Sequence, residues 1–381
     1  MEIERQLKIL NKSAIRTIIT KMGDILDCID VHKQPAFDHP LLKDHKIQMK
    51  PSYFIRKENI NKIDPSSTKA SSAQINELHK DIVCPTGTVP IRRITKRDLI
   101  FSNLLKMSRK NQTNGYPRIS TYHHYVSVET PYDEKNEYYG AKASFGIHKP
   151  FATPHQFSTS QMWLQNGPQD QTNSIETGWA VFPELFGDVA PRTFGYWTAD
   201  GYKDTGCFNM LCPGFVQVHT TIPFGTILNN TVPGSGEEVK EIFFWVHRDK
   251  ESQNWWYYMG NDDETPIGYW PKEIFTHLPY ASLIKFGGIA GAKIHVPSPP
   301  MGNGILPTDD YDMERTGFMR YLQILGEKGE THYFGNSAVT RKDLTRPDCY
   351  DVIFRKYGAA KRRKHGYNSM IFGGPGGGNC I

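Results

Sequence analysis

From residue 121 to the C-terminus, short strand-like runs alternate with turn residues at nearly regular spacing. The runs include YHHYVSVE, GAKASFGI, SIETGWAVF, EIFFWVHR and NWWYYMG, which are rich in β-branched and aromatic residues. Gly, Pro, Asn or Asp residues separate them. Because no long stretch follows the period of a helix, this pattern predicts an all-β domain, either a β-sandwich or a barrel.

The first 108 residues have a different character. Ile3, Leu7 and Leu10 recur at helical spacing, and an alternating, strand-like run begins at GDILDCID. A second, amphipathic helix is expected over Lys96–Met107. These patterns predict a small mixed α/β domain over residues 1–108.

The stretch RKNQTNGYPRIS joins the two parts and is polar, basic and turn-rich. We interpret residues 109–120 as a linker and residues 121–381 as the β domain. Exposed segments of this composition are where proteolytic cleavage concentrates.

The charge of the chain argues against a nucleic-acid partner. The formal net charge is only +5, and the run KRRK at residues 361–364 accounts for most of it. Such a run is typical of a solvated loop. No stretch is long enough to cross a membrane as an apolar helix. We therefore expect a monomer that has neither nucleic acid nor a membrane as its partner.

The six cysteines are an even number, which suits three disulfides, although the sequence alone leaves their pairing open. They are Cys28, Cys84, Cys207, Cys212, Cys349 and Cys380. No C-x-x-C pair and no H-E-x-x-H helix occurs in the sequence, so we expect no metal site.

Glycosylation sequons add to the case for a secreted protein. They begin at Asn11, Asn111 and Asn229. Residues 1–25 lack the apolar core and the cleavage site of a signal peptide, so the sequence as given shows no leader. The cysteines and sequons still favour a secreted protein, either extracellular or vacuolar.

The run SIETGWAVF places a carboxylate beside very small residues. Alternation puts Ile175 and Trp179 on one face, which suits the core, and Glu176, Gly178 and Ala180 on the other. The small residues leave room for a ligand and for a water held by the carboxylate. The alternative is an ordinary exposed glutamate, which the strand taken alone favours.

Gln161 and Trp163 share a face of the run SQMWLQ, opposite Met162. If this face adjoins Glu176, Gln161 can donate a hydrogen bond to a reacting carbonyl. In the run YWTADGY, the residues Tyr196, Thr198 and Asp200 alternate in the same way with Trp197 and Ala199. The alternative interpretation is that these are packing aromatics followed by a turn-forming Asp-Gly pair.

Motifs over nearly the whole chain occur in a recognisable order. CIDVHKQPAFDHPLLKDHKIQMKPS and CPTGTVPIRR lie in the first part. NSIETGW, FGYWTADGYKDTGCFNMLCPGFVQ, NWWYYMG, GYWP, MGNG and FGGPG follow in the second. Together they resemble the plant neprosin family, whose founding members are glutamic endopeptidases that cleave after proline.

The resemblance implies a zymogen, in which a pro-domain precedes a catalytic domain folded as an antiparallel two-sheet β-sandwich. The activation cleavage would fall within residues 109–120. The implied disulfides are Cys28–Cys84, Cys207–Cys212 and Cys349–Cys380. The implied partners are a proline-containing peptide or protein substrate and the chain's own pro-domain, and no cofactor is implied.

The family mechanism uses two glutamates. One ionised carboxylate takes a proton from the attacking water, while the other, protonated, polarises the scissile carbonyl. Two close carboxylates can share one proton, which favours acid pH. The resemblance assigns the first role to Glu176. The second glutamate ends a WGGE motif that reads FGGI here, so Ile289 stands in its place.

Isoleucine can neither donate nor accept a proton. Losing one member of a catalytic unit commonly costs orders of magnitude in rate. Lys293 or His295 would substitute for it only if the strand shifted register, which swaps faces and which we do not expect. Gln161 with Glu176 would form a Gln/Glu pair capable of weak hydrolysis.

Two functions therefore compete: a weakened glutamic endopeptidase, and a catalytically dead relative that binds proline-rich peptides or cell-wall protein. A carbohydrate-binding module is a third reading, against which the activation-peptide motifs argue. The expected substrate cleft comprises Trp163, Gly178, Tyr196, Trp197, Asp200 and Tyr202.

Overall fold

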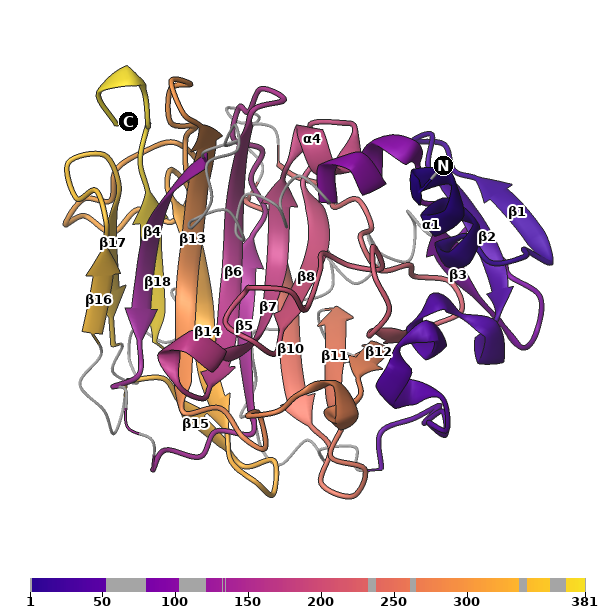
Figure 1. Cartoon of the computed structure of the whole chain (residues 1–381). Coiled ribbons are helices and arrows are strands. Elements are labelled where there is room, and N and C mark those ends of the chain that lie inside the picture. The colour runs from indigo at the N-terminus through magenta and orange to yellow at the C-terminus, as the bar shows by residue number, and fades with distance from the viewer. Residues whose placement is uncertain are drawn as a thin grey trace.

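The computed structural model describes residues 2–52, 80–102, 121–131, 133, 135–231, 238–260, 265–335, 341–356 and 368–380. Within these residues, two large antiparallel sheets pack face to face and a small third sheet lies beside one end of them (Figure 1). The predicted all-β sandwich, preceded by a small mixed N-terminal region, is confirmed. The predicted linker lies outside the described residues.

The N-terminal region begins with the predicted helix, α1 (Glu2–Leu10). Its sheet has the order β1-β2-β3, formed by β1 (Arg16–Ile19), β2 (Ile25–Asp30) and β3 (Thr88–Arg92). Three 3₁₀ turns follow β2, at Val31–Lys33, Pro35–Asp38 and Pro40–Leu42. Residues 96–102 are helical, which confirms the second predicted helix over its described part.

The first large sheet carries the candidate site, and its described strands number six in the order β16-β4-β13-β6-β7-β8. Their bounds are β4 (Thr121–Glu129), β6 (Gln156–Asn166), β7 (Asn173–Val181), β8 (Arg192–Thr198), β13 (Leu283–Lys293) and β16 (Arg341–Leu344). The short helix α4 (Pro183–Phe186) links β7 to β8.

The second large sheet has the order β17-β18-β14-β5-β10-β11-β12-β9 in the described chain, with β15 paired to β14. Its strands are β5 (Gly140–Gly146), β9 (Val216–Gln217), β10 (Glu241–Arg248), β11 (Trp255–Gly260), β12 (Thr265–Trp270), β14 (Gly317–Leu325), β15 (Thr331–Tyr333), β17 (Asp351–Arg355) and β18 (Ser369–Gly373). Since β9 has only two residues, the longer strand-like run GFVQVHTTI is mostly irregular.

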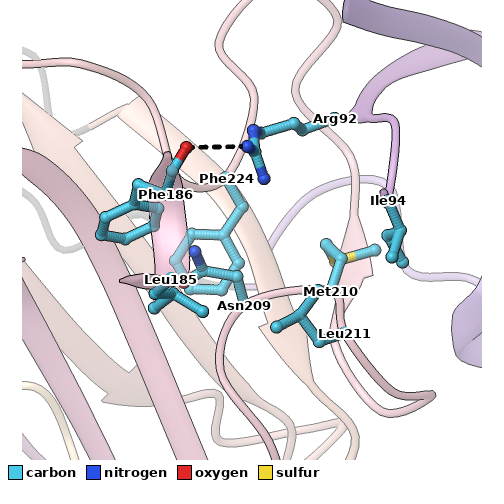
Figure 2. A pocket seen from close by; sticks show the side chains of 8 residues that line it. All are labelled: Arg92, Ile94, Leu185, Phe186, Asn209, Met210, Leu211 and Phe224. Atoms are coloured by element: carbon cyan, nitrogen blue, oxygen red, sulfur yellow. Dashed lines mark hydrogen bonds between the residues drawn. The ribbon is translucent and has the colours of Figure 1, made fainter. Parts of the chain in front are cut away.

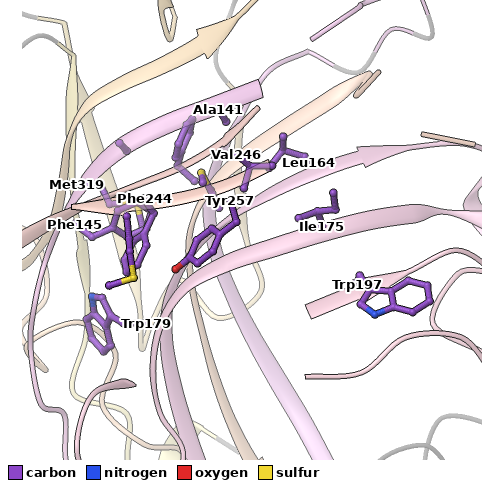
Figure 3. Packing of buried hydrophobic residues seen from close by; sticks show 14 of the residues in the cluster. Ala141, Phe145, Leu164, Ile175, Trp179, Trp197, Phe244, Val246, Tyr257 and Met319 are labelled. Carbon is purple, nitrogen blue, oxygen red and sulfur yellow. The ribbon is translucent and has the colours of Figure 1, made fainter. Parts of the chain in front are cut away.

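The core lies between the inner faces of the two large sheets (Figure 3). Ile175 and Trp179 point inward from β7, as predicted, and meet Phe244 and Tyr257 from the opposite sheet. The Trp179 indole N–H donates to the carbonyl of Gly146 at 3.0 Å, so a core aromatic also ties the sheets together. Inward residues on β7 force Glu176 onto the outer face.

The disulfides implied by the family resemblance are all present: Cys28–Cys84, Cys207–Cys212 and Cys349–Cys380. The first lies within the N-terminal region and the other two within the β domain. No disulfide among the described residues therefore links the two parts.

Candidate active site

Glu176 lies on β7, between Trp163 of β6 on one side and Tyr196 of β8 on the other. All three side chains point to the outer face of the six-stranded sheet, because paired residues of neighbouring strands share a face. We call this the Glu176 face. It brings together Glu176, Gln161, Trp163 and Tyr196, as the alternation in the sequence predicts.

Both oxygens of the Glu176 carboxylate accept hydrogen bonds. The side-chain amide of Gln161 donates to Oε2 at 2.8 Å, and the hydroxyl of Tyr202 donates to Oε1 at 2.6 Å. Such bonds stabilise the ionised form of a carboxylate. Burial, and after it the negative charge of Glu176, raise the pKa of Tyr202 well above its ordinary value. Glu176 is thus arranged as a base and Tyr202 as a donor.

A tight loop after β8 places the Tyr202 hydroxyl. Tyr202 has a φ of 66°, in the left-handed region that non-glycine residues seldom adopt. Asp200 holds this loop by accepting from the backbone N–H groups of Lys203, Asp204 and Thr205. Burial alone would raise the pKa of Asp200, but these bonds and those from hydroxyls hold it below its ordinary value.

Two glycines flank Gln161 on the Glu176 face. Gly178 of β7 lies opposite Gln161 on one side and Gly287 of β13 on the other. A Cβ at Gly178 would come within 2.0 Å of the Ser160 carbonyl oxygen, so the close approach of the backbones requires glycine there. The face around Gln161 consequently carries no other side chain in that row.

Ile289 is on the same face, two residues beyond Gly287 along β13. Glu176 lies two residues before Gly178, so Gln161 sits between Glu176 and Ile289 on one diagonal of the sheet. Diagonal neighbours of this kind are about 7–8 Å apart, within reach of long side chains. A glutamate at position 289 would thus approach Gln161 from the side opposite Glu176.

The register of β13 leaves Ile289 in that place. Ile289 pairs with Tyr125 of β4, and its backbone N–H donates to Thr159 Oγ1 at 3.0 Å. Lys293 forms an ion pair with Glu184 at 3.0 Å, at the end of β13, and His295 lies beyond the strand. Neither substitutes for the missing glutamate.

Two predicted cleft residues have other positions. The Trp197 side chain points into the core, because Trp197 pairs with the inward residue Ile175, so its assignment to the cleft is wrong. The Asp200 carboxylate accepts hydrogen bonds from the backbone of the loop, so Asp200 affects the site only by positioning Tyr202. The bond from Tyr202 to Glu176 was missed because it depends on this loop, and strand alternation carries no signal for it.

The Glu176 face is buried although it lies outside the sandwich. Glu176 and Ile289 are each 8% exposed, and Gln161 is 1% exposed. At one end of the face, Phe101 of the N-terminal region packs edge-on against Phe182 with ring centroids 5.2 Å apart. The N-terminal region thus contacts this face at its Phe182 end.

The sequons differ in their surroundings. The Asn11 side chain exchanges two hydrogen bonds of 2.8 Å with the backbone of Ile94, so its amide nitrogen is already used. Asn229 is exposed. Asn111 lies outside the described residues.

Comparison with known proteins identifies the family. Residues 154–375 match Neprosin, and residues 17–141 match the Neprosin activation peptide. The chain belongs to the neprosin family. The resemblance stated from the sequence motifs is confirmed, and this neprosin-family protein joins an activation-peptide region to a Neprosin domain.

Solved structures give a more distant similarity. Scytalido-glutamic peptidase with a peptide-based transition-state analogue is 10% identical, with a TM-score of 0.37 over 67% of this chain and 99% of that chain. SCP-B, a member of the Eqolisin family of peptidases in complex with the tripeptide Ala-Ile-His, is 9% identical, with a TM-score of 0.35 over 67% and 98%. Similarity at this level supports no statement about the chemistry of the site.

None of the helices in the described residues is long and apolar enough to span a membrane. No group of three or more His, Cys, Asp or Glu side chains among these residues is placed to hold a metal ion.

Proposed function

We propose that this chain is a secreted zymogen of a neprosin-type glutamic endopeptidase, directed at proline-containing polypeptides at acid pH and strongly weakened in catalysis. The carrying observation is the diagonal of the Glu176 face. It has an oriented carboxylate at one end, an amide in the middle and Ile289 at the other end. The proline preference comes from the family resemblance.

Glu176 would act as general base toward a water bound on its face. Its ionised form is held by Gln161 and Tyr202, so it can accept a proton without rearranging its surroundings. The scissile carbonyl would then rely on the Gln161 amide as a neutral donor. An amide stabilises developing negative charge but cannot deliver a proton, so hydrolysis would be slow.

The activation-peptide match supports the zymogen part of the proposal. The activation peptide, the three disulfides and the exposed sequon at Asn229 fit a secreted precursor that acts outside the cell or in a vacuole.

A second function is favoured by Ile289 itself. An apolar residue in place of a catalytic acid suits a protein that binds proline-rich peptides or cell-wall protein and releases them uncut. The Glu176 face would then be a recognition surface, with Gln161 and Tyr202 as hydrogen-bond donors.

The deciding experiment uses the full chain secreted behind an added signal peptide. The protein is acidified to about pH 3–5, where a carboxyl pair shares one proton, and assayed on a proline-containing peptide. We expect slow cleavage by the parent, abolished in Glu176→Gln, and faster cleavage by at least about 100-fold in Ile289→Glu. Ile289→Gln is the matched control, because it has the shape of glutamate without the acid.

The outcomes separate the two functions. No cleavage by the parent, together with binding of the uncut peptide, would establish the recognition protein. Parent cleavage that survives in Glu176→Gln would remove Glu176 from the mechanism and overturn the proposal.

A further inference from the structure

At the contact between the N-terminal region and the β domain, one glutamine side chain makes the two backbone hydrogen bonds that a neighbouring β-strand would make. The Gln34 amide donates to the Gln217 carbonyl at 2.9 Å, and the Gln217 backbone N–H donates to the Gln34 side-chain oxygen at 2.8 Å. Both residues are 1% exposed, and Gln217 lies on β9 at the edge of its sheet. Without Gln34, an edge strand would keep unpaired backbone groups.

A buried charge also spans this contact, which we call the seam. Arg192 of β8 is 1% exposed and donates to both oxygens of Asp24 at 2.9 and 3.0 Å. It also donates to Asp188 at 2.6 Å and to the Gly225 carbonyl at 3.2 Å. Removing Asp24 would leave a buried guanidinium with half of its carboxylate partners, which is strongly unfavourable.

Gln48 supplies a third set of polar contacts. Its side-chain oxygen accepts from the Trp256 indole N–H at 3.0 Å and from the Asn254 amide at 3.1 Å. Its backbone N–H donates to the Tyr269 hydroxyl at 3.0 Å. These aromatics lie on the outer face of the nine-stranded sheet, so departure of the N-terminal region would expose them.

Apolar residues of the N-terminal region also pack against residues of the β domain. Among the described residues, no buried apolar cluster consists of N-terminal residues alone. Leu10, Leu99 and Phe101 belong to a cluster with Phe182 and Phe194. Two further clusters are shared. Ala36 packs with the aromatic residues on the outer face of the nine-stranded sheet. The main core includes five residues of the N-terminal region, which are Ile29, Val31, Leu42, Val89 and Ile91.

A small cavity of about 30 Å³ lies at the seam, lined by Arg92 and Ile94 on one side and on the other by Leu185, Phe186, Asn209, Met210, Leu211 and Phe224 (Figure 2). It has room for water only. Arg92 donates to the Phe186 carbonyl at 3.1 Å across this region. Arg92 therefore links the two parts beside this cavity.

We propose that the N-terminal region, residues 1–102, is a permanent subunit of this protein: after a cut in the linker it stays bound at neutral pH as a second chain. The β9 edge, Arg192 and the outer aromatic face are its binding surface. The inference rests on the proposed zymogen only for where the cut occurs.

The test cuts the chain with an external protease, so its result is independent of whether the protein hydrolyses peptides. A recognition sequence for a site-specific protease replaces part of residues 109–120 in the full secreted chain. After complete cutting at pH 7, we expect both fragments to elute together at the size of the intact protein. Separate elution, with a soluble and monodisperse β domain, would overturn the proposal.

Unfolding in urea gives a second readout. All seven tryptophans lie in the β domain, and Trp197 and Trp256 contact His39 and Gln48 of the N-terminal region. We expect the cut protein to unfold in one transition by tryptophan fluorescence, with a midpoint that rises with protein concentration. A midpoint independent of concentration would show that the fragments are not held together.

Gln34→Ala and Gln156→Ala form a matched pair for this assay. The Gln156 amide also joins one backbone donor and one acceptor, Thr153 N–H at 2.8 Å and the Pro297 carbonyl at 2.7 Å, but both are inside the β domain. Only Gln34→Ala should speed fragment dissociation, by at least about tenfold. Equal dissociation rates in the two variants would contradict the role of the seam.

Discussion

The seam and the Glu176 face both use glutamine and carboxylate side chains, but they differ in whether each of these groups has a matching partner. At the seam, Gln34 meets matching backbone groups and Arg192 meets two carboxylates. On the Glu176 face, the carboxylate has two donors, yet the diagonal ends in Ile289. The Gln34 and Arg192 side chains at the seam thus have matching polar partners, whereas the diagonal of the Glu176 face ends in a side chain that can neither donate nor accept a proton.

This difference indicates what each region contributes. Buried polar groups without partners destabilise a fold, so the seam must stay complete for the chain to be stable. A carboxyl pair on the Glu176 face would bury two like charges, which costs stability and is kept only for function. Ile289 removes that cost together with the second acid.

The largest expected effect comes from breaking the seam at Arg192. Arg192→Met would leave Asp24 and Asp188 without their buried cation and should lower the free energy of unfolding by about 3–5 kcal/mol. Urea denaturation at pH 7 measures it. Arg5→Met is the control, because the Arg5 and Glu2 side chains are 65% and 59% exposed and their ion pair should contribute little. Equal losses of unfolding free energy in the two variants would show that burial of Arg192 does not strengthen its ion pairs.

Completing the diagonal should have the next largest effect, and its size should depend on pH. Ile289→Glu places a second carboxyl on the buried Glu176 face, and we expect a loss of about 2–3 kcal/mol in the free energy of unfolding at pH 7. The loss relative to the parent should shrink near pH 4, where the new carboxyl is neutral. Ile289→Gln, measured by the same urea titrations, should lose stability equally at both pH values. A pH-independent loss in Ile289→Glu would show that no charge is buried there.

A smaller effect tests the far end of the seam. The Asp249 carboxylate accepts from the backbone N–H and hydroxyl of Ser52, both at 2.6 Å. Burial alone would raise the pKa of Asp249, but these bonds and those from Ser252 hold it below its ordinary value. Its contribution is therefore complete above the unfolded-state pKa of about 4 and is lost as pH falls through the lower folded-state value.

Asp249→Asn should accordingly remove about 1–2 kcal/mol at pH 7 and flatten the acid limb of the stability curve. Thermal or urea unfolding from pH 2 to pH 7 would show this. Asp170→Asn, at an exposed position, should leave the curve unchanged. A parallel downward shift of the whole curve in Asp249→Asn would contradict the pKa argument.

The smallest effect concerns the donors of Glu176. Burial and the charge of Glu176 together raise the pKa of Tyr202, so Glu176→Gln should lower it while leaving the contribution of burial in place. Difference absorbance of tyrosinate would detect one tyrosine titrating at lower pH than in the parent. Glu129→Gln changes a carboxylate at the far side of the same sheet, paired with Lys285, and should leave Tyr202 as it is.

Much of the Glu176 face follows from strand alternation. The period of two assigns Glu176, Gln161 and Trp163 to one face and Trp179 to the core, because both faces of each strand have clear chemistry. Trp197 was misassigned since an inward tryptophan and a ligand-binding tryptophan look alike in sequence. The disulfide pairing and the place of Ile289 required the family pattern.

The seam could not be predicted in the same way. Asp24 and Arg192 are 168 residues apart, and Gln34 and Gln217 are 183 apart. The residues around Gln34 do not reveal that its side chain bonds to the edge of a sheet, because a glutamine exposed to solvent occurs in the same kind of local sequence. Tyr202 was assigned to the cleft, but its hydrogen bond to Glu176 was not predicted for a related reason: the bond depends on a left-handed residue in a loop.

The long separation between Gln34 and Gln217 also affects how the protein is made. The N-terminal region emerges from the ribosome first, but its partner strand β9 follows 183 residues later. At typical rates of synthesis, roughly ten to forty seconds pass between the two. During this time the apolar residues of the N-terminal region have no complete cluster to join. The growing chain therefore depends on chaperones or on solubility of its first hundred residues until most of the β domain has been synthesised.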